Sequence, residues 1–185
     1  YDPDGAKKLL EESGWTDTDG DGYVDKDGQK LSINWLTYPT RLEQPKLAEY
    51  AQATLKDIGI DVVVNNTSDH MTIAKSGDFD VYVSSTTTAP TGDPEYFFTS
   101  TVTGAKNYGN YQNEEVTKLT DQLHQTFDKD ERSKLAVELQ QDILDDDAFF
   151  FVSHLNMGIV TKSNVTGMAA HPCDYYEITA DLDVK

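Results

Sequence analysis

The order of apolar runs in residues 31–83 constrains the fold more than any other feature of the sequence. Residues 31–36 and 60–64 are rich in β-branched, aromatic and aliphatic side chains, which is typical of strands. Between them, apolar residues recur at steps of three and four and share one helical face: Leu47, Tyr50, Ala51, Leu55 and Ile58. A short helix at 71–75 and a strand at 79–83 follow. This alternation predicts an α/β fold with a mixed, mainly parallel sheet flanked by helices.

Helix signals continue on both sides of this region. Asp2 and Pro3 predict a helix start and Gly14 its end, and Asp93-Pro94 predicts another start. Two longer helices are predicted from their apolar faces, which are Val116, Leu119, Leu123 and Phe127 in the first and Leu135, Leu139, Ile143 and Leu144 in the second.

Two apolar runs near the C-terminal end, 149–152 and 159–160, predict buried closing strands. Residues 167–185 lack clear periodicity and are predicted to be a tail. No internal repeat and no linker rich in Pro, Gly and Ser divides the chain, so it is expected to form one unit.

Charge and composition exclude several classes of protein. The chain has 33 acidic and 15 basic residues and a formal net charge of -18, which argues against a nucleic-acid partner because phosphate binding needs clustered Lys and Arg. No apolar run approaches the roughly 20 residues that cross a bilayer, and no basic N-terminal segment precedes an apolar core. We therefore expect a soluble chain without a targeting signal. Its one cysteine, Cys173, cannot form an internal disulfide.

The segment Asp17–Asp25 matches the first half of a calcium-binding EF-hand loop. Carboxylates at alternate positions can converge on one ion, and Gly22 permits the sharp bend. The candidate metal residues are Asp17, Asp19, Asp21, Tyr23 and Asp25. The twelfth position, where the motif has a bidentate Glu, is Gly28 here. The two readings, a structural calcium loop and a solvated acidic turn, are weighed equally.

The sequence offers no catalytic constellation. It has no Gly-x-Ser-x-Gly elbow, no glycine-rich phosphate loop and no His-Glu-x-x-His motif. The four histidines are not spaced as metal ligands, and the helical pair Asp121 and His124 is read as solvated charge. Catalysis therefore has no support in the sequence, so the chain is not predicted to be an enzyme, and no cofactor is required.

Seven segments, taken in order, resemble the extracytoplasmic solute-binding proteins of peptide and nickel ABC importers. These segments are YDPDGAKKLLEESGW (1–15), DTDGDGYVDKDG (17–28), LAEYAQATLKDIGIDVVV (47–64), GDFDVYV (77–83), TAPTGDPEYFF (88–98), NYGNYQNEEVTKL (107–119) and LQQDILDDDAFFFVSHL (139–155). The resemblance covers almost the whole chain.

The resemblance implies a longer, two-lobed parent of the periplasmic-binding-protein kind. Residues 1–166 would form one α/β lobe, and residues 167–185 would pack on the other lobe. It also implies a monomer that lies outside the cytoplasm, in the periplasm or lipid-anchored on the surface. Its partners would be a small-molecule or metal-chelate ligand and a membrane permease.

In this family two loops of the lobe line the ligand cleft. Carried over by position, the ligand-binding candidates are Thr86, Thr87, Thr88, Pro90, Thr91, Asn107, Tyr108 and Tyr111. Many peptide-binding members place an acidic residue shortly before the Asp-Pro pair, where this chain has Pro90 and threonines. Ala89-Pro90 is more similar to the loop of metal-chelate importers, and hydroxyls can hydrogen-bond a chelator's carboxylates.

Three functions from different classes follow. The first is capture of nickel or a related metal as a small chelate, with oligopeptide or dipeptide capture as its alternative. The second is a structural domain stabilised by calcium. A hydrolase is a distant third, because no pair of nucleophile and base can be proposed.

Overall fold

A computed structural model describes residues 1–156, 158–170 and 178–185, which fall into two compact units, 1–85 and 86–185. Each unit is described by itself. The prediction that residues 1–166 form a single lobe stays a prediction.

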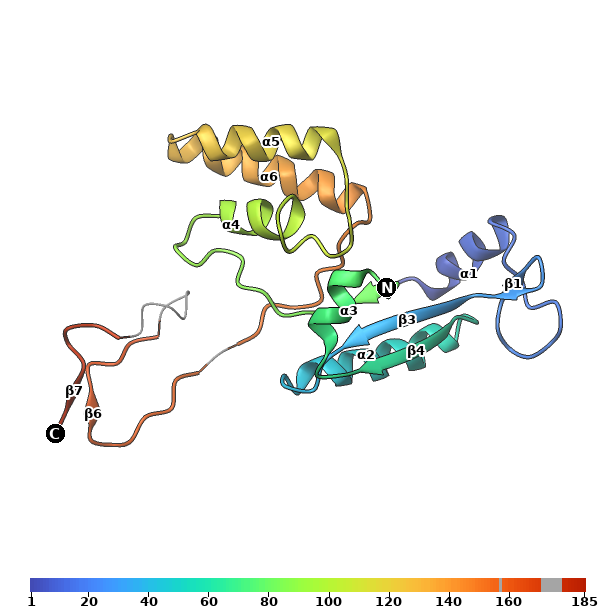
Figure 1. The fold of residues 1–185 in the computed structure, drawn as a ribbon, viewed down its shortest axis with the longest axis horizontal. Coiled ribbons are helices and arrows are strands. Elements are labelled where there is room, and N and C mark those ends of the chain that lie inside the picture. Colours follow the sequence, from blue (N-terminus) through green and yellow to red (C-terminus); the bar gives the residue numbers. More distant parts are fainter. Residues whose placement is uncertain (157, 171–177) are drawn as a thin grey trace. The chain divides into compact units, whose positions relative to one another are not determined.

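A three-stranded parallel sheet organises the first unit (Figure 1). Its central strand β3 (Ser32–Thr37) pairs with β4 (Asp61–Asn66) on one side and β5 (Val81–Tyr82) on the other. The register joins Ser32 to Asp61 and runs the full length of β3 and β4. The predicted α/β fold with a mainly parallel sheet is confirmed.

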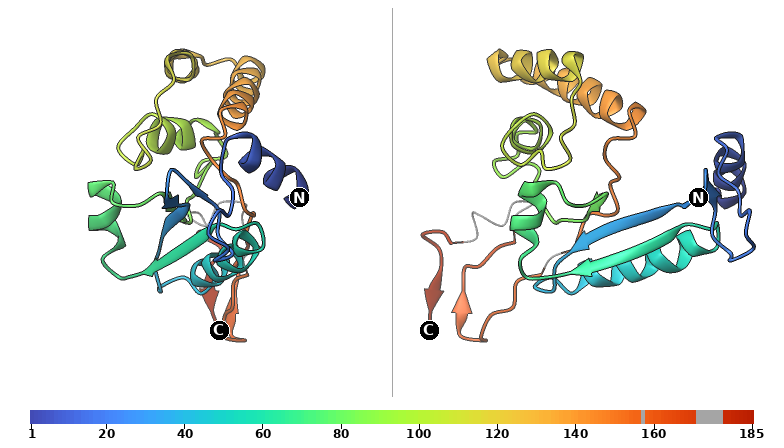
Figure 2. Two further views of the ribbon diagram at one scale, coloured as in Figure 1. Left: turned by 90° about the vertical axis from the view of Figure 1, so that its right-hand side faces the viewer. Right: turned by 45° about the vertical axis from the view of Figure 1, so that its right-hand side comes forward.

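Helix α2 (Glu43–Lys56) connects β3 to β4 and runs along the sheet (Figure 2). Ala48 is fully buried on its inner side, and the Gln52 side-chain amide donates to the Val62 carbonyl at 2.6 Å. The chain turns at Gly59, whose φ is +83°, and a Cβ there would lie 2.9 Å from Val24 Cγ1. Glycine is therefore required both by conformation and by space.

The two short helices of this unit also agree with the sequence, whereas its hairpin was not predicted. Helix α1 (Pro3–Glu12) is capped by Asp2, whose carboxylate accepts from the Gly5 N–H at 2.9 Å. Helix α3 (His70–Ser76) ends at Gly77 in a left-handed conformation. The strands β1 (Asp25–Lys26) and β2 (Gln29–Lys30) form a small hairpin beside the acidic loop.

The second unit is built on helices. α4 (Glu95–Phe97) continues into a π-helical turn (Phe98–Val102), and α5 (Glu114–Gln125) packs on α6 (Lys129–Asp145). Together they bury one apolar cluster: Phe97, Phe98, Val102, Val116, Leu119, Leu123, Leu135, Ala136, Leu139 and Ile143. Both predicted long helices are confirmed.

A two-residue antiparallel pair, β6 (Val165–Thr166) and β7 (Asp183–Val184), joins the end of the chain to residue 165. Most of the segment between them, 171–177, including Cys173, lies outside the described residues. The proposed packing of the 167–185 tail stays a prediction.

Two sequence expectations are wrong. Phe127 and Leu144 were placed on buried helical faces but are 92% and 48% exposed, because α5 ends at Gln125 and the α6 face turns away after Ile143. Residues 149–152 and 159–160 form no strand, since no described strand offers them a backbone partner; Phe150 and Val160 are 88% and 97% exposed. An apolar run becomes a strand only where a neighbour completes its ladder.

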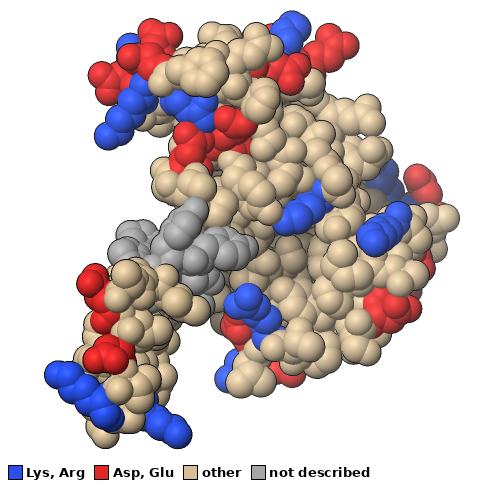
Figure 3. All heavy atoms as spheres, turned by 60° about the vertical axis from the view of Figure 1, so that its left-hand side comes forward, with Lys and Arg blue, Asp and Glu red and all other residues tan. Residues whose placement is uncertain are grey.

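Two further features are the distribution of charged side chains on the surface and the length of the helices. Acidic and basic side chains are interspersed over the face drawn in Figure 3, without a basic patch. Among the described helices, none combines the length and the apolar character that crossing a bilayer demands.

Truncation of Leu139 tests the helical core. Leu139 is fully buried, so Leu139→Ala should lower the free energy of unfolding by about 3 kcal/mol through lost burial and a cavity. Val137 lies two residues earlier on the same helix and is 66% exposed. Val137→Ala should leave the midpoint of urea unfolding almost unchanged, and equal losses for both variants would contradict this packing.

Candidate functional site

The first group of predicted ligand residues lies in the loop that follows β5 in the sequence and opens the second unit. Thr86, Thr88 and Thr91 are exposed, and Thr87 and Pro90 are half-buried. Within the loop, the Gly92 N–H closes a turn on the Ala89 carbonyl at 3.0 Å. None of the four threonine hydroxyls hydrogen-bonds a described residue, so each can donate to or accept from a ligand.

The second predicted group, Asn107, Tyr108 and Tyr111, is engaged within the protein. The Asn107 side chain donates to the Tyr111 carbonyl at 2.8 Å and accepts from the Tyr111 N–H at 2.9 Å, which closes the loop. The Tyr111 hydroxyl donates to Asp146 at 2.6 Å. Tyr108 is half-buried. No hydrogen bond in the described part of the chain joins Asn107 or Tyr111 to the threonine loop.

The electrostatics of Tyr111 agree with a structural hydrogen bond. Burial and the Asp146 carboxylate raise the pKa of the Tyr111 hydroxyl to about 12, so it stays protonated as a donor. The same bond, with a second from Asn113 at 2.7 Å, lowers the pKa of Asp146. Two of the three residues in this group therefore shape the loop with their polar atoms.

The sequence analysis missed Arg132, which fixes the far end of the threonine loop. Its guanidinium forms a fork on Asp93 at 2.9 and 2.6 Å and reaches Glu95 at 2.7 Å. Its remaining N–H groups donate to the carbonyls of Leu123 and Thr126 at the end of α5, at 2.7 and 2.6 Å. All five guanidinium N–H donors are thus used. A lone arginine in a charged helix gives no sequence signal for this role.

Arg132 also sets the ionisation of its partners. Its hydrogen bonds are the main cause that lowers the pKa of Asp93 and of Glu95. His124 adds to the effect on Glu95, since its Nδ1 lies 2.6 Å from Glu95 Oε1. His124 therefore pairs with Glu95 on another element, while Asp121, its proposed helical partner, is exposed.

The acidic loop brings three of its carboxylates together. Oxygen atoms of Asp17, Asp19 and Asp21 all lie within 4.8 Å of one another, and all three residues are exposed. Asp17 also accepts from the N–H groups of Gly20 and Gly22 at 2.8 and 3.0 Å.

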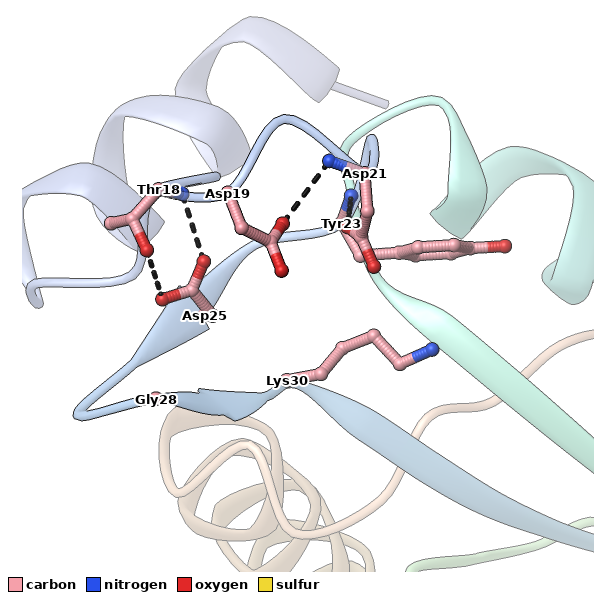
Figure 4. Close-up of a pocket in the computed structure, with 7 residues that line it drawn as sticks. All are labelled: Thr18, Asp19, Asp21, Tyr23, Asp25, Gly28 and Lys30. Carbon is pink, nitrogen blue, oxygen red and sulfur yellow. Dashed lines mark hydrogen bonds between the residues drawn. The ribbon is translucent and has the colours of Figure 1, made fainter.

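The other two predicted metal residues line the same pocket as Asp19 and Asp21 but have partners of their own. Asp25 accepts from the Thr18 N–H and hydroxyl at 2.8 and 2.7 Å, which lowers its pKa (Figure 4). The Tyr23 ring lies 4.5 Å from Lys30 Nζ, and that ammonium pairs with Asp61 at 3.0 Å. The residues present therefore fit the first half of a calcium loop through three carboxylates.

A second feature absent from the sequence analysis is a ring cluster at the carboxyl end of the sheet. His70 stacks on Tyr38 with ring centroids 4.2 Å apart and 19° between planes. Its Nδ1 lies 2.8 Å from the Tyr82 hydroxyl. The three residues are far apart in sequence and follow or end three different strands, so no local pattern could reveal them.

Residues 1–109 match the family described as "Bacterial extracellular solute-binding proteins, family 5 Middle". Among individual relatives, the oligopeptide-binding protein AppA of Bacillus subtilis is 30% identical over 96% of this chain and 34% of its own length. The nickel-binding periplasmic protein of Escherichia coli is 26% identical over 93% of this chain and 34% of its own. The chain thus spans about a third of the length of these curated relatives.

Solved structures of a peptide-binding and of a nickel-binding protein are also similar to this chain. AppA of Bacillus subtilis in complex with a nonapeptide matches with a TM-score of 0.66 at 29% identity, over 78% of this chain and 30% of that one. NikA of Staphylococcus aureus in complex with Ni(L-His)2 matches with a TM-score of 0.64 at 30% identity, over 75% and 28%. These relatives are solute-binding proteins, which agrees with the prediction that the chain is not an enzyme.

Substitution of Arg132 by glutamine should lower the free energy of unfolding at pH 7 by about 2 kcal/mol, the value of hydrogen bonds between charged groups. The pKa values of Asp93 and Glu95 are lowered in the folded state, so their contribution to stability is complete above the unfolded-state pKa of about 4.3. That contribution is lost as the pH falls through the pKa values of the folded state. The difference between wild type and Arg132→Gln should therefore shrink between pH 5 and pH 3.

Urea unfolding at several pH values measures this difference. Arg41 is exposed and forms no ion pair among the described residues, so Arg41→Gln is the matched control and should change little. A loss for Arg132→Gln that is the same at pH 7 and pH 3 would show that the carboxylates do not contribute.

Proposed function

The chain belongs to family 5 of the bacterial extracellular solute-binding proteins, and we propose that it forms part of the substrate-binding component of an ABC importer. In this proposal the protein lies outside the cytoplasm, captures a small solute and delivers it to a membrane permease. The observation that carries the proposal is the similarity to solute-binding proteins over more than nine-tenths of the chain.

The proposed cargo is nickel or a related metal held as a small chelate. The loop Thr86–Thr91 supports this cargo because it has no charged group and presents four hydroxyls that form no hydrogen bond with the described residues. Hydroxyls can hydrogen-bond the carboxylates of a chelator without adding charge. Among the relatives named above, two carry nickel-binding names or a bound nickel complex.

Peptide capture is the alternative cargo, and the likeness to AppA supports it equally. A peptide has an ammonium group that needs an acidic or carbonyl partner. The loop offers no carboxylate before Asp93, and the two oxygens of Asp93 are held by Arg132. The loop therefore offers a peptide ammonium no free carboxylate, and this single feature is our reason for naming the metal chelate first.

We also propose a structural calcium ion at the loop Asp17–Asp21. The convergence of three carboxylates within 4.8 Å supports it, because calcium prefers several oxygen ligands and tolerates irregular geometry. Solvent would complete the shell. In this second role the ion stabilises the loop between α1 and β1 and takes no part in cargo capture.

The cargo is tested on the complete protein by native mass spectrometry and calorimetry, with Ni²⁺ plus two equivalents of L-histidine and with a mixture of short peptides. We expect retention of a nickel complex. Thr87→Val should weaken nickel-complex binding about tenfold, the effect of one hydrogen bond to a charged group.

Thr161 is exposed and distant in sequence, so Thr161→Val is the matched control and should bind like wild type. Retention of a peptide without metal would assign the protein to the peptide importers. No binding of either class at micromolar concentration would contradict the proposed function as a whole.

The calcium proposal predicts a thermal shift. Addition of 5 mM CaCl₂ should raise the melting temperature by about 3 °C, as expected for a dissociation constant near 0.5 mM. Asp19→Asn keeps the oxygen that accepts from the Asp21 N–H but removes the charge, and should abolish the shift. Asp27→Asn, at an exposed turn in the same region, should keep it. An equal shift in both variants would refute calcium binding at this loop.

A further inference from the structure

Three side chains of the first unit form a series of polar contacts that ends at a methionine sulfur. His70 and Met71 open α3, and Tyr82 ends β5. Figure 1 shows α3 at the end of the sheet toward which β3 and β4 point. The Tyr82 hydroxyl lies 2.8 Å from His70 Nδ1 and donates to Met71 Sδ at 3.9 Å. One hydroxyl group therefore contacts both an imidazole nitrogen and a thioether sulfur.

The single hydrogen of the Tyr82 hydroxyl couples these two contacts. While that hydrogen points to Met71 Sδ, the hydroxyl oxygen accepts from His70, and the neutral imidazole carries its hydrogen on Nδ1. If the hydroxyl turns and donates to Nδ1 instead, the imidazole hydrogen lies on Nε2. A thioether is a weak acceptor, so it holds the hydroxyl hydrogen only weakly. The strength of the acceptor at Met71 therefore influences which tautomer of His70 is formed.

The sulfur is accessible to solvent, whereas the rings beside it are held in place. Met71 is 39% exposed, so a small oxidant can reach its side chain. His70 stacks on Tyr38 with ring centroids 4.2 Å apart, and the Tyr82 ring lies 5.8 Å from that of Phe79. An oxygen added to the sulfur therefore meets a hydroxyl group whose ring is already positioned.

We propose that Met71 is a peroxide-sensitive modification site, and that its oxidation is transmitted through the Tyr82 hydroxyl to the tautomer of His70. In this step the Met71 sulfur donates an electron pair to one oxygen of hydrogen peroxide, and the O–O bond breaks. The proton of the transferred oxygen passes to the departing hydroxide, which leaves as water. The sulfur is oxidised by two electrons to the sulfoxide, and the peroxide is reduced by two.

The sulfoxide changes the acceptor that the Tyr82 hydroxyl meets. Its oxygen is polar and accepts a hydrogen bond more strongly than the thioether does. The Tyr82 hydrogen then stays directed at Met71, and His70 keeps its own hydrogen on Nδ1. Nε2 of His70 is left as the acceptor nitrogen at the end of the sheet. Methionine sulfoxide reductases reverse the oxidation, so the change is reversible.

Another methionine of the chain supplies an internal comparison. Met168 is half-buried, and its sulfur forms no hydrogen bond within the described residues. Met157 lies outside the described residues. Met168 is therefore expected to be oxidised more slowly than Met71, and its oxidation should leave His70 unchanged.

The first experiment measures the rate of oxidation at each methionine. The complete protein is treated with hydrogen peroxide at pH 7, and its peptides are mapped by mass spectrometry over time. Met71 should be oxidised about fivefold faster than Met168, because its side chain is more exposed. Met168→Leu is the matched control and should leave the rate at Met71 unchanged.

The second experiment measures the tautomer of His70 by nuclear magnetic resonance in protein labelled with ¹⁵N at its histidine rings. At about pH 8.5, well above the usual pKa of imidazole, peroxide should raise the ratio of the Nδ1–H to the Nε2–H form about threefold. Methionine sulfoxide reductases should restore the original ratio. Met71→Leu should show no response to peroxide. Tyr82→Phe should still be oxidised at Met71 but show no change at His70.

The outcomes separate the site from its transmission. Equal rates of oxidation at Met71 and Met168 would overturn Met71 as a preferred site. Oxidation of Met71 without a change in the His70 tautomer would overturn the transmission. The same change at His70 in wild type and Tyr82→Phe would show that the hydroxyl does not carry it. If circular dichroism shows that Tyr82→Phe does not fold, the comparison of wild type with Met71→Leu still decides whether His70 responds to the sulfur of Met71.

Discussion

The guanidinium of Arg132 joins three segments of the second unit through a single side chain. It holds Asp93 at the end of the threonine loop, Glu95 at the start of α4 and the last carbonyls of α5, while its own backbone belongs to α6. Its side chain is only 15% exposed, so an unpaired carboxylate or guanidinium here would be costly. The loop that follows β5 in the sequence is consequently anchored at its far end by the guanidinium of Arg132, while its threonine hydroxyls form no hydrogen bond with the described residues.

In the first unit the constraint is the direction of the strands. Because β3, β4 and β5 are parallel, the residues that follow each of them meet at one edge. A sheet of this kind brings together side chains that lie more than forty residues apart, as with Tyr38 and Tyr82. The N–H of Ser85 donates to the Tyr38 hydroxyl, and Ser85 directly precedes the threonine loop in the sequence. The direction of the strands, and not a sequence motif, therefore brings these side chains together.

Sequence patterns predicted the helices and strands better than the contacts between side chains. Periodicity and capping residues located the helices and the parallel strands, because the signals of Asp2, Gly59 and the apolar faces are local. The run at 149–152 was misread as a strand, since pairing depends on a neighbour that no local pattern specifies. Among the candidate site residues, the threonines lie in a polar loop as expected, whereas Asn107 and Tyr111 use their polar atoms internally. Arg132 and His70 contact residues that are far away in sequence, so composition and spacing could not identify these contacts.

The central claim is that the threonine loop, Thr86–Thr91, takes part in holding a nickel chelate. The most direct measurement is anomalous diffraction at the nickel edge, from crystals of the complete protein grown with Ni²⁺ and L-histidine. The account predicts one strong anomalous peak, with chelator density in hydrogen-bond contact with the hydroxyls of Thr86–Thr91. A peak only at exposed residues far from this loop, or continuous peptide density at the loop without an anomalous signal, would contradict it.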